Sequence, residues 1–551
     1  MGMFSHLSKA TLYWNTLRYL RPVQITGRLK HTLCKPKIRS DILGQQRAVV
    51  GIWQQPAQRG CRMVSSEEFC FLNEIHAVRN ASDWNNPHWA KLWLYNLHYF
   101  DDLTAIDAEQ RSNWHRALIQ RWIEENPPGV GNGWEPYPTS LRIVNWIKWG
   151  LSGNELDEGW LNSLAVQARW LEQNLETHLL GNHLFANAKA LIYASLFLQG
   201  EVADRWYEVG KKLVDRELSE QVLEDGGNFE LSTMYHTIFL EDLLDLVNIN
   251  HTYDRPLFPE IEEKIGRMFR WLSTMCHPDG EISFFNDAAL GVTPSVAEIR
   301  TYGKRLGLYS DNGGRSDENF VDLPHSGYSR VEVKDAVVIV DRAAVGPDYL
   351  PGHAHADTLS FELSLFGQRV IVNSGTSSYG TGEQRQIERS TATHSTVHID
   401  SENSSEVWGG FRVARRARVH ERVHFVSDQQ IRLSACHDGY QRLNGKPYHC
   451  REWLFKGNAL IITDRVMGRG KHELCSVLPL HPNIQITNQL SDSVVLTVSG
   501  HEVQIQFEGS GELSVVDGKY NPEFGLSIES SQLQYHIIGP LPDKIVTRIS
   551  W

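Results

Sequence analysis

The spacing of apolar residues changes once along the 551-residue chain, and this change constrains the fold more than any other feature. From about residue 85 to 307, apolar residues recur every three to four positions, which is the period of an amphipathic helix. After the segment 308–327, short β-branched runs such as "AVVIVD", "LSFELSLF" and "RVIVNSG" are separated by Gly, Asn and Ser turns. The two periods predict a helical domain followed by a sheet domain.

The chain is too long for a single core of ordinary size, so two or three domains are expected. We divide it into a basic N-terminal arm with a lead-in (residues 1–84), a helical domain (85–310) and an antiparallel β-sandwich (311–551). Short breaks such as "PPGVGNGWEPYP" and "EDGGN" separate the helical segments, so consecutive helices should pair antiparallel.

The first 40 residues are basic, although the whole chain has a net charge of −12. They contain no Asp or Glu and eight basic residues. These are Lys9, Arg18, Arg21, Arg28, Lys30, Lys35, Lys37 and Arg39. With its Trp, Tyr and Leu neighbours, this arm is suited to an anionic membrane surface. The alternative is a basic helix that packs on the acidic body of its own protein.

Three features bear on where the protein works. Seven cysteines without a CxxC pair indicate reduced thiols rather than a disulfide framework. The first residues lack the apolar core and cleavage site of a secretory signal, and no apolar run approaches the length of a membrane span. We therefore expect a cytoplasmic protein, with peripheral contact at the inner membrane through the arm. Overall acidity and the lack of a recognition motif argue against nucleic acid as a partner.

Two imidazoles and a carboxylate stand two residues apart in "GHAHADTLSF", residues 352–361. His353, His355 and Asp357 share their parity with the apolar residues that follow. In a strand, residues two apart lie on the same face. Titratable groups on a buried face must find partners, because burying them alone is costly. The stretch therefore predicts a polar site at the end of a buried strand.

Two stretches of the helical half also carry polar groups. In "LLGNHLFANAKAL", Asn182 and His183 open a helix, where Asn182 could cap the helix or both residues could bind a carboxylate. In "EDGGNFELSTMYHTIFLEDL", Tyr235 and His236 follow a Gly-rich turn. An aromatic residue in a helix usually packs in the core, but the polar neighbours of Tyr235 also fit a chemical role.

Arginines and aromatic residues supply candidate sugar contacts. Arg412 belongs to an arginine cluster in "EVWGGFRVARRARVH", which suits bidentate binding of carboxylate or sulfate. The alternative for this cluster is an edge strand kept soluble by charge. Arg142, with Trp134 and Tyr137 in the preceding loop, suits a sugar subsite, because aromatic faces pack on the apolar faces of sugar rings.

Together, "GNH", the Tyr235–His236 segment, "GHAHAD", "VIVNSGT" and "RSTATHSTV" resemble the heparinase II/III-like polysaccharide lyases over most of the chain. The resemblance implies an incomplete (α/α) toroid followed by an antiparallel β-sandwich, in agreement with the two hydrophobic periods. It also implies an enzyme, a carbon–oxygen lyase that acts on acidic polysaccharides or oligosaccharides.

The resemblance implies roles for particular residues. The C5 hydrogen of a uronate is very weakly acidic, so the carboxylate must be neutralised and a base must be well placed. Asn182 and His183 would hold the carboxylate. Tyr235 would be the acid, and could also serve as the base, while His353 would be the partner base on the opposite face of the cleft. The expected substrate contacts are Arg142, Trp134, Tyr137, His236, Arg389 and Arg412.

The family also includes metal-containing relatives, and the resemblance places their ligand positions at His355, Asn373 and His394. A neutral Asn is a poor zinc ligand beside Cys, His, Asp and Glu. We expect no required cofactor. Zinc at His355 and His394 is the alternative, with Asn373 at the third position or Asp357 recruited instead.

We expect a polysaccharide lyase that cleaves a uronate-containing glycan by β-elimination. The first alternative is a uronosyl C5-epimerase that acts on an acidic, lipid-linked glycan during surface polysaccharide synthesis. Hydrolysis would need two facing carboxylates, and nothing in the spacing of Glu135, Asp225, Glu230 and Asp287 pairs them. A glycan-binding protein without catalysis is the remaining alternative.

Overall fold

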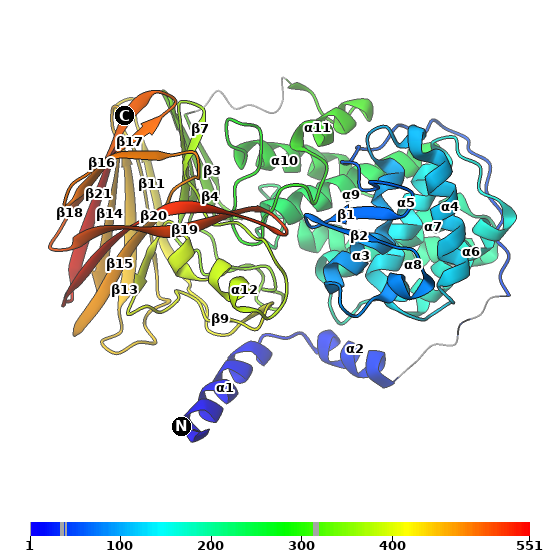
Figure 1. The fold of residues 1–551 in the computed structure, drawn as a ribbon, viewed down its shortest axis with the longest axis horizontal. Helices are drawn as coiled ribbons and strands as arrows, with labels where there is room; N and C mark the ends of the chain where they lie inside the picture. The colour runs from blue at the N-terminus through cyan, green and yellow to red at the C-terminus, as the bar shows by residue number, and fades with distance from the viewer. Residues whose placement is uncertain (1, 34–37, 39–40, 312–318) are drawn as a thin grey trace.

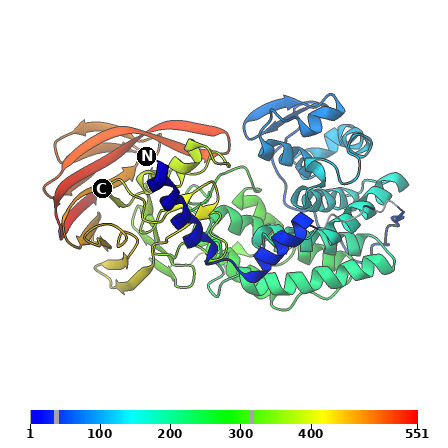
Figure 2. The same cartoon turned by 90° about the horizontal axis from the view of Figure 1, so that it is seen from below.

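The computed structural model describes residues 2–33, 38, 41–311 and 319–551. A helical body and a body of sheets lie side by side, and two N-terminal helices cross one side of the molecule (Figures 1 and 2). This confirms the expected fold class, an incomplete (α/α) toroid followed by an antiparallel β-sandwich. The connection between the bodies includes residues 312–318, which lie outside the described residues.

The toroid buries a large apolar core that is rich in tryptophan. Trp93, Trp122, Trp146 and Trp206 are almost fully buried in it. The helices are α3 (Lys91–Tyr99), α4 (Ser112–Glu125), α5 (Pro136–Leu151), α6 (Glu158–Gln173), α7 (Gly181–Phe197), α8 (Glu201–Gln221), α9 (Thr233–Thr252), α10 (Ile261–Thr274) and α11 (Val296–Arg305). Some consecutive helices pack against each other, as the short breaks between them predict, most extensively α7 and α8. Alternate helices also pack together, with α5 in contact with α3 and α7, and α7 in contact with α9.

The sheet body is a sandwich whose sheets share one apolar core. One sheet has eight strands in the order β11-β12-β13-β14-β21-β18-β17-β16, and two others have the orders β19-β20-β15-β8 and β3-β4-β5-β6-β7. The strands are β3 (Phe320–Leu323), β4 (Tyr328–Val333), β5 (Ala336–Asp341), β6 (Phe361–Leu365), β7 (Gln368–Ile371), β8 (Val397–Ile399), β11 (Val419–Val426), β12 (Ile431–His437), β13 (Tyr448–Phe455), β14 (Ala459–Met467), β15 (Lys471–Pro479), β16 (Gln485–Gln489), β17 (Ser493–Val498), β18 (His501–Glu508), β19 (Glu512–Glu523), β20 (Leu526–Pro540) and β21 (Asp543–Ser550). A short helix, α12 (Glu383–Glu388), and a small ribbon of β9 (Val407–Trp408) and β10 (Arg412–Val413) lie beside the sandwich.

Strand β6 begins later than its alternating sequence predicts. Residues 352–360 form an irregular loop, and Leu359, two residues before the strand begins at Phe361, has a positive φ of 65°. The expectation of one strand from His353 onward is therefore wrong. The loop runs from the sandwich toward the toroid. Hydrogen bonds from other segments hold it in place; for example, the Arg389 guanidinium donates to the carbonyl of Ala354.

The two bodies meet through buried polar contacts. Glu362 and Ser364 lie on the face of β6 turned away from the sandwich core, and both contact the ring of His277 after α10. His277 Nε2 lies 2.7 Å from Glu362 Oε2, and its Nδ1 lies 2.8 Å from Ser364 Oγ. All three side chains are buried. The alternating polar residues of β6 are therefore explained by the interface with the toroid.

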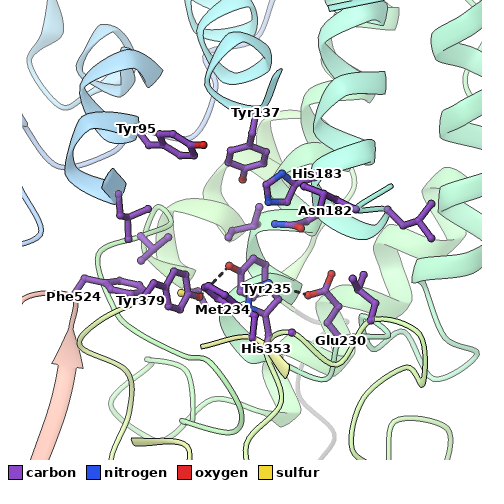
Figure 3. Close-up of a pocket in the computed structure, with 18 of the residues that line it drawn as sticks. Tyr95, Tyr137, Asn182, His183, Glu230, Met234, Tyr235, His353, Tyr379 and Phe524 are labelled. Carbon is purple, nitrogen blue, oxygen red and sulfur yellow. Dashed lines mark hydrogen bonds and ion pairs between the residues drawn. The ribbon is translucent and has the colours of Figure 1, made fainter. Parts of the chain in front are cut away.

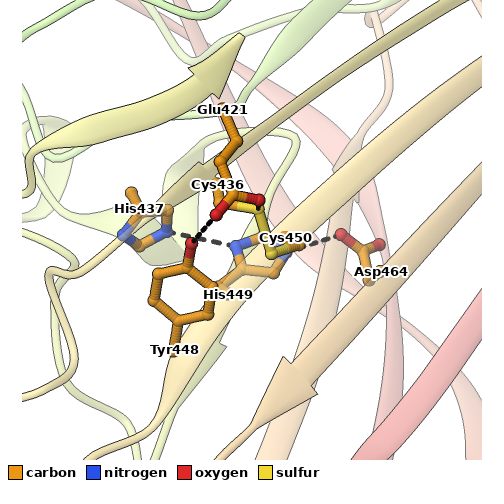
Figure 4. Close-up of a disulfide and its surroundings, with 7 residues drawn as sticks. All are labelled: Glu421, Cys436, His437, Tyr448, His449, Cys450 and Asp464. Carbon is orange, nitrogen blue, oxygen red and sulfur yellow. Dashed lines mark hydrogen bonds and ion pairs between the residues drawn. A yellow bond between two sulfur atoms is a disulfide. The ribbon is translucent and has the colours of Figure 1, made fainter. Parts of the chain in front are cut away.

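One disulfide contradicts the expectation of reduced thiols. Cys436 on β12 and Cys450 on β13 are directly opposed in the antiparallel register and form a disulfide (Figure 4). It lies beside a buried chain of hydrogen bonds from His437 to His449 and from His449 to Asp464. The other four cysteines that the structure describes, Cys61, Cys70, Cys276 and Cys475, are free thiols. Disulfides persist in oxidising environments, so this bond weakens the argument from reduced thiols, and the cytoplasmic location stays a prediction.

The N-terminal region consists of two helices and a hairpin. The helices α1 (Gly2–Leu17) and α2 (Pro22–Leu33), which we call the arm helices, cross between the two bodies (Figure 2). Strands β1 (Glu68–Phe71) and β2 (Glu74–Ala77) form the hairpin. Of the eight expected basic residues, Lys35, Lys37 and Arg39 lie outside the described residues. Within the described residues, no helix has the length and apolar character needed to cross a membrane.

Candidate active site

A cleft of about 700 Å³ lies between the toroid and the sandwich (Figure 3). It is lined by side chains from α3, α5, α7, α9, the loop 348–353 and the arm helices. Four of the expected site residues, Asn182, His183, Tyr235 and His353, line this cleft together. They come from positions far apart in the sequence, so the fold assembles them.

Tyr235 is fixed near the start of α9. The Ser232 side chain caps this helix by accepting from the backbone N–H of Tyr235 at 3.1 Å, and its hydroxyl donates to the carbonyl of Asp287. Leu231 precedes the cap with a φ of 60°. The Tyr235 hydroxyl lies 3.0 Å from the hydroxyl of Tyr379. Burial, with Tyr379 and Asp287 nearby, raises the pKa of Tyr235 well above its ordinary value.

His353 lies against Tyr235 on the same side of the cleft. The centroids of the two rings are 3.8 Å apart and the ring planes are tilted by 30°. His353 Nδ1 lies 2.9 Å from Asp287 Oδ2, and its Nε2 lies 3.5 Å from Glu230 Oε2. The expectation that His353 stands on the face opposite Tyr235 is wrong, because the irregular loop folds it back onto α9.

Asp287 anchors His353 from beneath. It is fully buried and accepts from Arg385, whose Nη2 lies 2.7 Å from Oδ2. His355 Nε2 lies 2.8 Å from Oδ1. Burial opposes ionisation, but the Arg385 charge and the hydrogen bonds from His353 and His355 hold the pKa of Asp287 well below its ordinary value. Asp287 is therefore a buried carboxylate that orients His353, and it does not line the cleft.

Asn182 and His183 face the cleft from the first turn of α7. Leu180 precedes the helix with a φ of 64°, and its side chain makes no capping hydrogen bond. Asn182 is therefore not the N-cap residue. His183 Nδ1 lies 3.0 Å from Glu176 Oε1. Burial alone would lower the pKa of His183, but Glu176 raises it above its ordinary value. The opening of α7 thus combines an amide, a histidine that favours its charged form and the positive end of a helix.

Glu230 is a site residue that the sequence suggested only as a hydrolytic carboxylate. It is buried, lines the cleft and approaches Gly181, where any side chain on Gly181 would collide with its Oε1. Burial raises the pKa of Glu230, although His353 and the backbone N–H of Asn182 counteract this. Glu230 thus connects the start of α7 to His353.

The residues expected at a metal site lie together only in part. His355 Nδ1 is 3.2 Å from His394 Nε2, and His394 Nδ1 is 2.7 Å from the carbonyl of Ser390. Asn373 lies within hydrogen-bond distance of serine groups. Among the described residues, no group of three or more His, Cys, Asp or Glu could hold a metal ion. Two imidazoles without a third anionic or imidazole ligand do not make the site that zinc prefers.

Four of the expected substrate contacts are buried outside the cleft, so the structure corrects these assignments. Arg142 donates to Gln167 and stacks on Trp122, with its guanidinium carbon 3.7 Å from the ring centroid. Trp134 donates from Nε1 to the carbonyl of Asn126.

The other two misplaced contacts are His236 and Arg389. The His236 ring stacks on Trp271, and its Nε2 lies 3.0 Å from the carbonyl of Met268. Arg389 donates to backbone carbonyls, including that of Gly410 at 2.8 Å. In each case a polar side chain that looked functional in the sequence forms hydrogen bonds with buried backbone groups or packs on an aromatic ring.

Tyr137 and Arg412 do line the cleft. The Tyr137 ring lies 4.5 Å from the ring of His183, centroid to centroid. Tyr379 and Tyr95 also line the cleft, and sequence reasoning missed both as site residues. Tyr379 lies three residues after the stretch "VIVNSGT" (residues 370–376), so its place beside that motif was the available signal.

Comparisons with known proteins agree with this architecture. Residues 98–313 match the heparinase II/III N-terminus, and residues 315–551 match the heparinase II/III-like C-terminal domain. The chain belongs to the heparinase II/III-like family. A heparin-sulfate lyase from Bacteroides stercoris is 29% identical over 245 residues, which are 40% of this chain and 36% of the relative. One from Pedobacter heparinus is 25% identical over 316 residues, 51% of this chain and 47% of the relative.

A crystal structure of heparinase III has the same fold as this heparinase II/III-like protein. Its TM-score is 0.66 with 17% sequence identity, and the match covers 82% of this chain and 76% of that one. The two heparin-sulfate lyases are matched over less than half of their own length. The activity of this chain is therefore argued from its own cleft.

Proposed function

We propose that this protein is a polysaccharide lyase that cleaves a uronate-containing glycan by β-elimination. One observation carries the proposal: a phenol, an imidazole bound to a buried carboxylate, and an amide–imidazole pair at a helix N-terminus line one cleft. These are the acid, the base and the carboxylate-binding groups that the reaction needs. The names of the curated relatives, all heparin-sulfate lyases, support this reading.

The first task is to neutralise the substrate carboxylate. Asn182 can donate two hydrogen bonds, and His183 carries a pKa raised by Glu176, so its charged form is favoured. The open end of α7 adds exposed N–H groups and the positive end of the helix dipole. Charge that develops at C5 can then spread onto a carboxylate that is already stabilised.

The second task is to remove the C5 proton. With Nδ1–H donated to Asp287, the lone pair of His353 lies on Nε2, which is 3.5 Å from Glu230 Oε2. When Nε2 takes the proton, the buried carboxylate of Asp287 stabilises the resulting imidazolium. This is the same use of a carboxylate that orients histidine bases in other enzymes.

The third task is to protonate the leaving O4. Tyr235 keeps its proton at neutral pH because its pKa is raised, so the phenol is available as an acid. Its hydroxyl is already in a hydrogen bond with Tyr379. The electrons of the C5–H bond form the C4–C5 double bond as the C4–O4 bond breaks, and O4 leaves with the proton of Tyr235.

We propose that Tyr235 and His353, whose rings stack on each other, act as acid and base from one side of the sugar. Elimination on one side is a syn elimination. It suits a uronate whose C5 hydrogen and O4 lie on the same face of the ring, as they do in D-glucuronate. We therefore propose a glucuronate-type residue at the cleavage site.

The epimerase alternative needs a proton donor that reaches C5 from the face opposite His353. The named activities of the relatives favour elimination over this reading. Hydrolysis is disfavoured because Glu230 and Asp287 both contact the single ring of His353, and Asp287 is buried beneath it. They do not flank a cleft from two sides, as hydrolytic carboxylates do.

Incubation of the purified protein with a panel of uronate-containing glycans tests the proposal. Elimination creates a double bond conjugated to the carboxylate, which absorbs in the ultraviolet. We expect this absorbance with at least one glucuronate-containing glycan, and its loss in Tyr235→Phe. Hydrolysis products without absorbance would reject the lyase.

We propose that the reaction needs no metal. The proposed roles are filled by side chains of this chain, and Asn373 occupies the position of the third ligand. Dialysis against a chelator, with metal content measured before and after, should leave the rate of elimination unchanged. A rate that falls with the loss of bound zinc and returns when zinc is restored would overturn this.

We also propose that the outer face of the arm helices contacts anionic lipid, beside the glycan as the principal partner. Ile25, Leu29 and Leu33 are exposed on α2, and Trp14 is exposed on α1. Basic residues such as Lys30 surround them. Flotation with vesicles tests this: binding should require an anionic lipid and weaken in Leu29→Glu. Equal flotation with neutral vesicles, or none with either kind, would contradict it.

A further inference from the structure

The arm helices bridge the toroid and the sandwich, and their inner face belongs to the cleft. On the sandwich side, the ring of Tyr13 meets the edge of Trp408 at a centroid distance of 4.9 Å. Trp408 Nε1 donates to Thr16 Oγ1 at 3.1 Å. Arg416 stacks over the ring of Tyr19, 3.9 Å from its centroid. The end of α1 and the turn after it are therefore fixed to strand β9 and to the segment that follows β10 by specific contacts.

On the toroid side, α2 is held by charge and by close packing. Arg21 forms an ion pair of 2.6 Å with Glu220 on α8. The ring of His31 stacks on His178, with centroids 4.7 Å apart. Gly27 is buried against His178 so closely that an added Cβ would lie 2.9 Å from the Cβ of His178. The approach of α2 to the toroid thus depends on a residue without a side chain.

The inner face of the arm helices lines one end of the cleft. Its lining residues are Tyr13, Thr16, Leu17, Leu20, Gln24 and Arg28. Gln24 is only 2% exposed and donates to the carbonyl of Tyr349, which also lines this end. The arm helices are therefore a wall of the cleft.

A second bridge bounds the cleft elsewhere. Asn73, in the turn between β1 and β2, donates to the carbonyl of Phe524 in the turn between β19 and β20. Leu72 and Phe524 both line the cleft. Figure 3 shows Phe524 and Tyr379 on one side of Tyr235 and Glu230 on the other. The contact between Asn73 and Phe524 is therefore a second bridge between the toroid region and the sandwich, beside the cleft.

We propose that the arm helices close one end of the cleft, so that the protein accepts the end of a glycan chain and releases short products instead of cutting long chains internally. The proposal rests on the proposed lyase function and adds how the glycan enters the cleft. A long polymer could lie across the catalytic residues only if the cleft were open at both ends. The arm wall occupies the path that the chain would take beyond one end.

The closed end carries positive charge suited to the terminus of an acidic glycan. Arg28 on α2 and Arg412 on β10 both line it. Arg412 is stacked on Trp408, with its guanidinium carbon 4.8 Å from the ring centroid, which holds it in place. A guanidinium binds carboxylate or sulfate through directed hydrogen bonds. The anionic group of the terminal sugar is therefore assigned to this end.

Docking of the arm can be tested directly with Trp408→Ala in the full chain. Trp408 contacts the arm but does not line the cleft. Removing one aromatic pair and one hydrogen bond should shift the docking equilibrium by about tenfold. Trypsin cleavage at Arg18 or Arg21 should accelerate by a similar factor. Arg415→Ala is the matched control, because Arg415 pairs with Glu406 nearby and does not line the cleft.

The effect on the reaction is read from product size. On a long glycan, the native protein and Arg415→Ala should release short unsaturated products while the mean mass of the remaining polymer falls slowly. Trp408→Ala should lower that mean mass several-fold faster for the same number of double bonds formed. Because Trp408 also supports Arg412, the KM of this variant for a tetrasaccharide should rise. Its kcat should stay close to that of the native protein, which shows that Tyr235 and His353 are intact.

Two results would overturn the inference. One is a native protein that fragments the polymer internally from the first turnovers. The other is a Trp408→Ala protein that trypsin cleaves faster but whose product sizes are unchanged. This would show that the arm helices do not control how the glycan enters the cleft. Absence of any double bond with either substrate would instead reject the lyase function itself, and the inference with it.

Discussion

The ring of Tyr235 lies against the ring of His353, with centroids 3.8 Å apart. This relationship joins the first helix turn of α9 to the irregular loop before β6, and it places a phenol and an imidazole on the same side of the cleft. An acid and a base in this arrangement can act on neighbouring carbons of one sugar ring. The predictions below follow from that pair and from the groups that hold it.

Tyr235→Phe should reduce the rate of elimination by about 10²–10⁴-fold, because the leaving oxygen loses its proton donor. Folding should be preserved, since the ring still packs on His353. Tyr379→Phe is the matched control: it removes the hydroxyl that contacts Tyr235 but not the donor, so the loss should be much smaller. Rates from ultraviolet absorbance, with melting temperatures for all three proteins, check this. Equal losses in the two variants would refute the assignment of Tyr235 as the acid.

Asp287→Asn should reduce kcat by about 10²-fold or more, because His353 loses the acceptor that fixes its tautomer and stabilises its charged form. The same change leaves the buried Arg385 without its partner and should cost about 3–5 kcal/mol of stability. Glu230→Gln provides the comparison: it also contacts His353 but forms no ion pair with a buried arginine. Both kcat and the free energy of unfolding, measured with denaturant, should be lower for Asp287→Asn than for Glu230→Gln. A fully active Asp287→Asn protein would show that Asp287 does not orient the base.

Glu176→Gln should shift the alkaline limb of the pH profile to lower pH. Glu176 raises the pKa of His183, so the charged imidazole persists at a higher pH than that of an ordinary histidine. The charged form is present below this pKa and is lost as the pH rises through it. Without Glu176 the loss begins at lower pH. Profiles of kcat/KM for the two proteins test this, and coincident alkaline limbs would mean that His183 does not act through its charge.

Matched substrates that differ only at C5 should be distinguished. In D-glucuronate the C5 hydrogen and O4 lie on one face of the ring, whereas in L-iduronate they lie on opposite faces. With acid and base on one side, the glucuronate substrate should be preferred by about 10²-fold in kcat/KM, because misplacement of a reacting group has a cost of that order. A preference for iduronate would require a base on the opposite wall of the cleft.

The sequence predicted the fold from a local property, the period of its apolar residues. That property is sufficient to order a helical body before a sandwich, because each element must bury its apolar face. It could not predict the start of strand β6, which comes only after Leu359 has adopted a positive φ. Nor could it predict the Cys436–Cys450 disulfide, which depends on the register between two strands.

The sequence identified some residues of the cleft correctly, but it also suggested residues that lie outside the cleft. Asn182, Tyr235 and His353 stand in short stretches whose polar groups exceed what packing requires. Arg142 and His236 looked similar in the sequence, but they satisfy buried groups of the toroid. Only the tertiary structure separates these two cases, because a polar side chain near a cleft and one beneath it have the same local sequence.

The most direct test of the central claim is elimination in deuterated water, followed by ultraviolet absorbance, product mass and deuterium content at C5. The substrate is a glucuronate-containing oligosaccharide, and Tyr235→Phe and Tyr379→Phe are measured beside the native protein. We predict new absorbance, and products whose masses sum to that of the substrate without added water, with little signal from Tyr235→Phe. Deuterium at C5 of uncleaved glycan without absorbance would instead establish epimerisation and contradict the account.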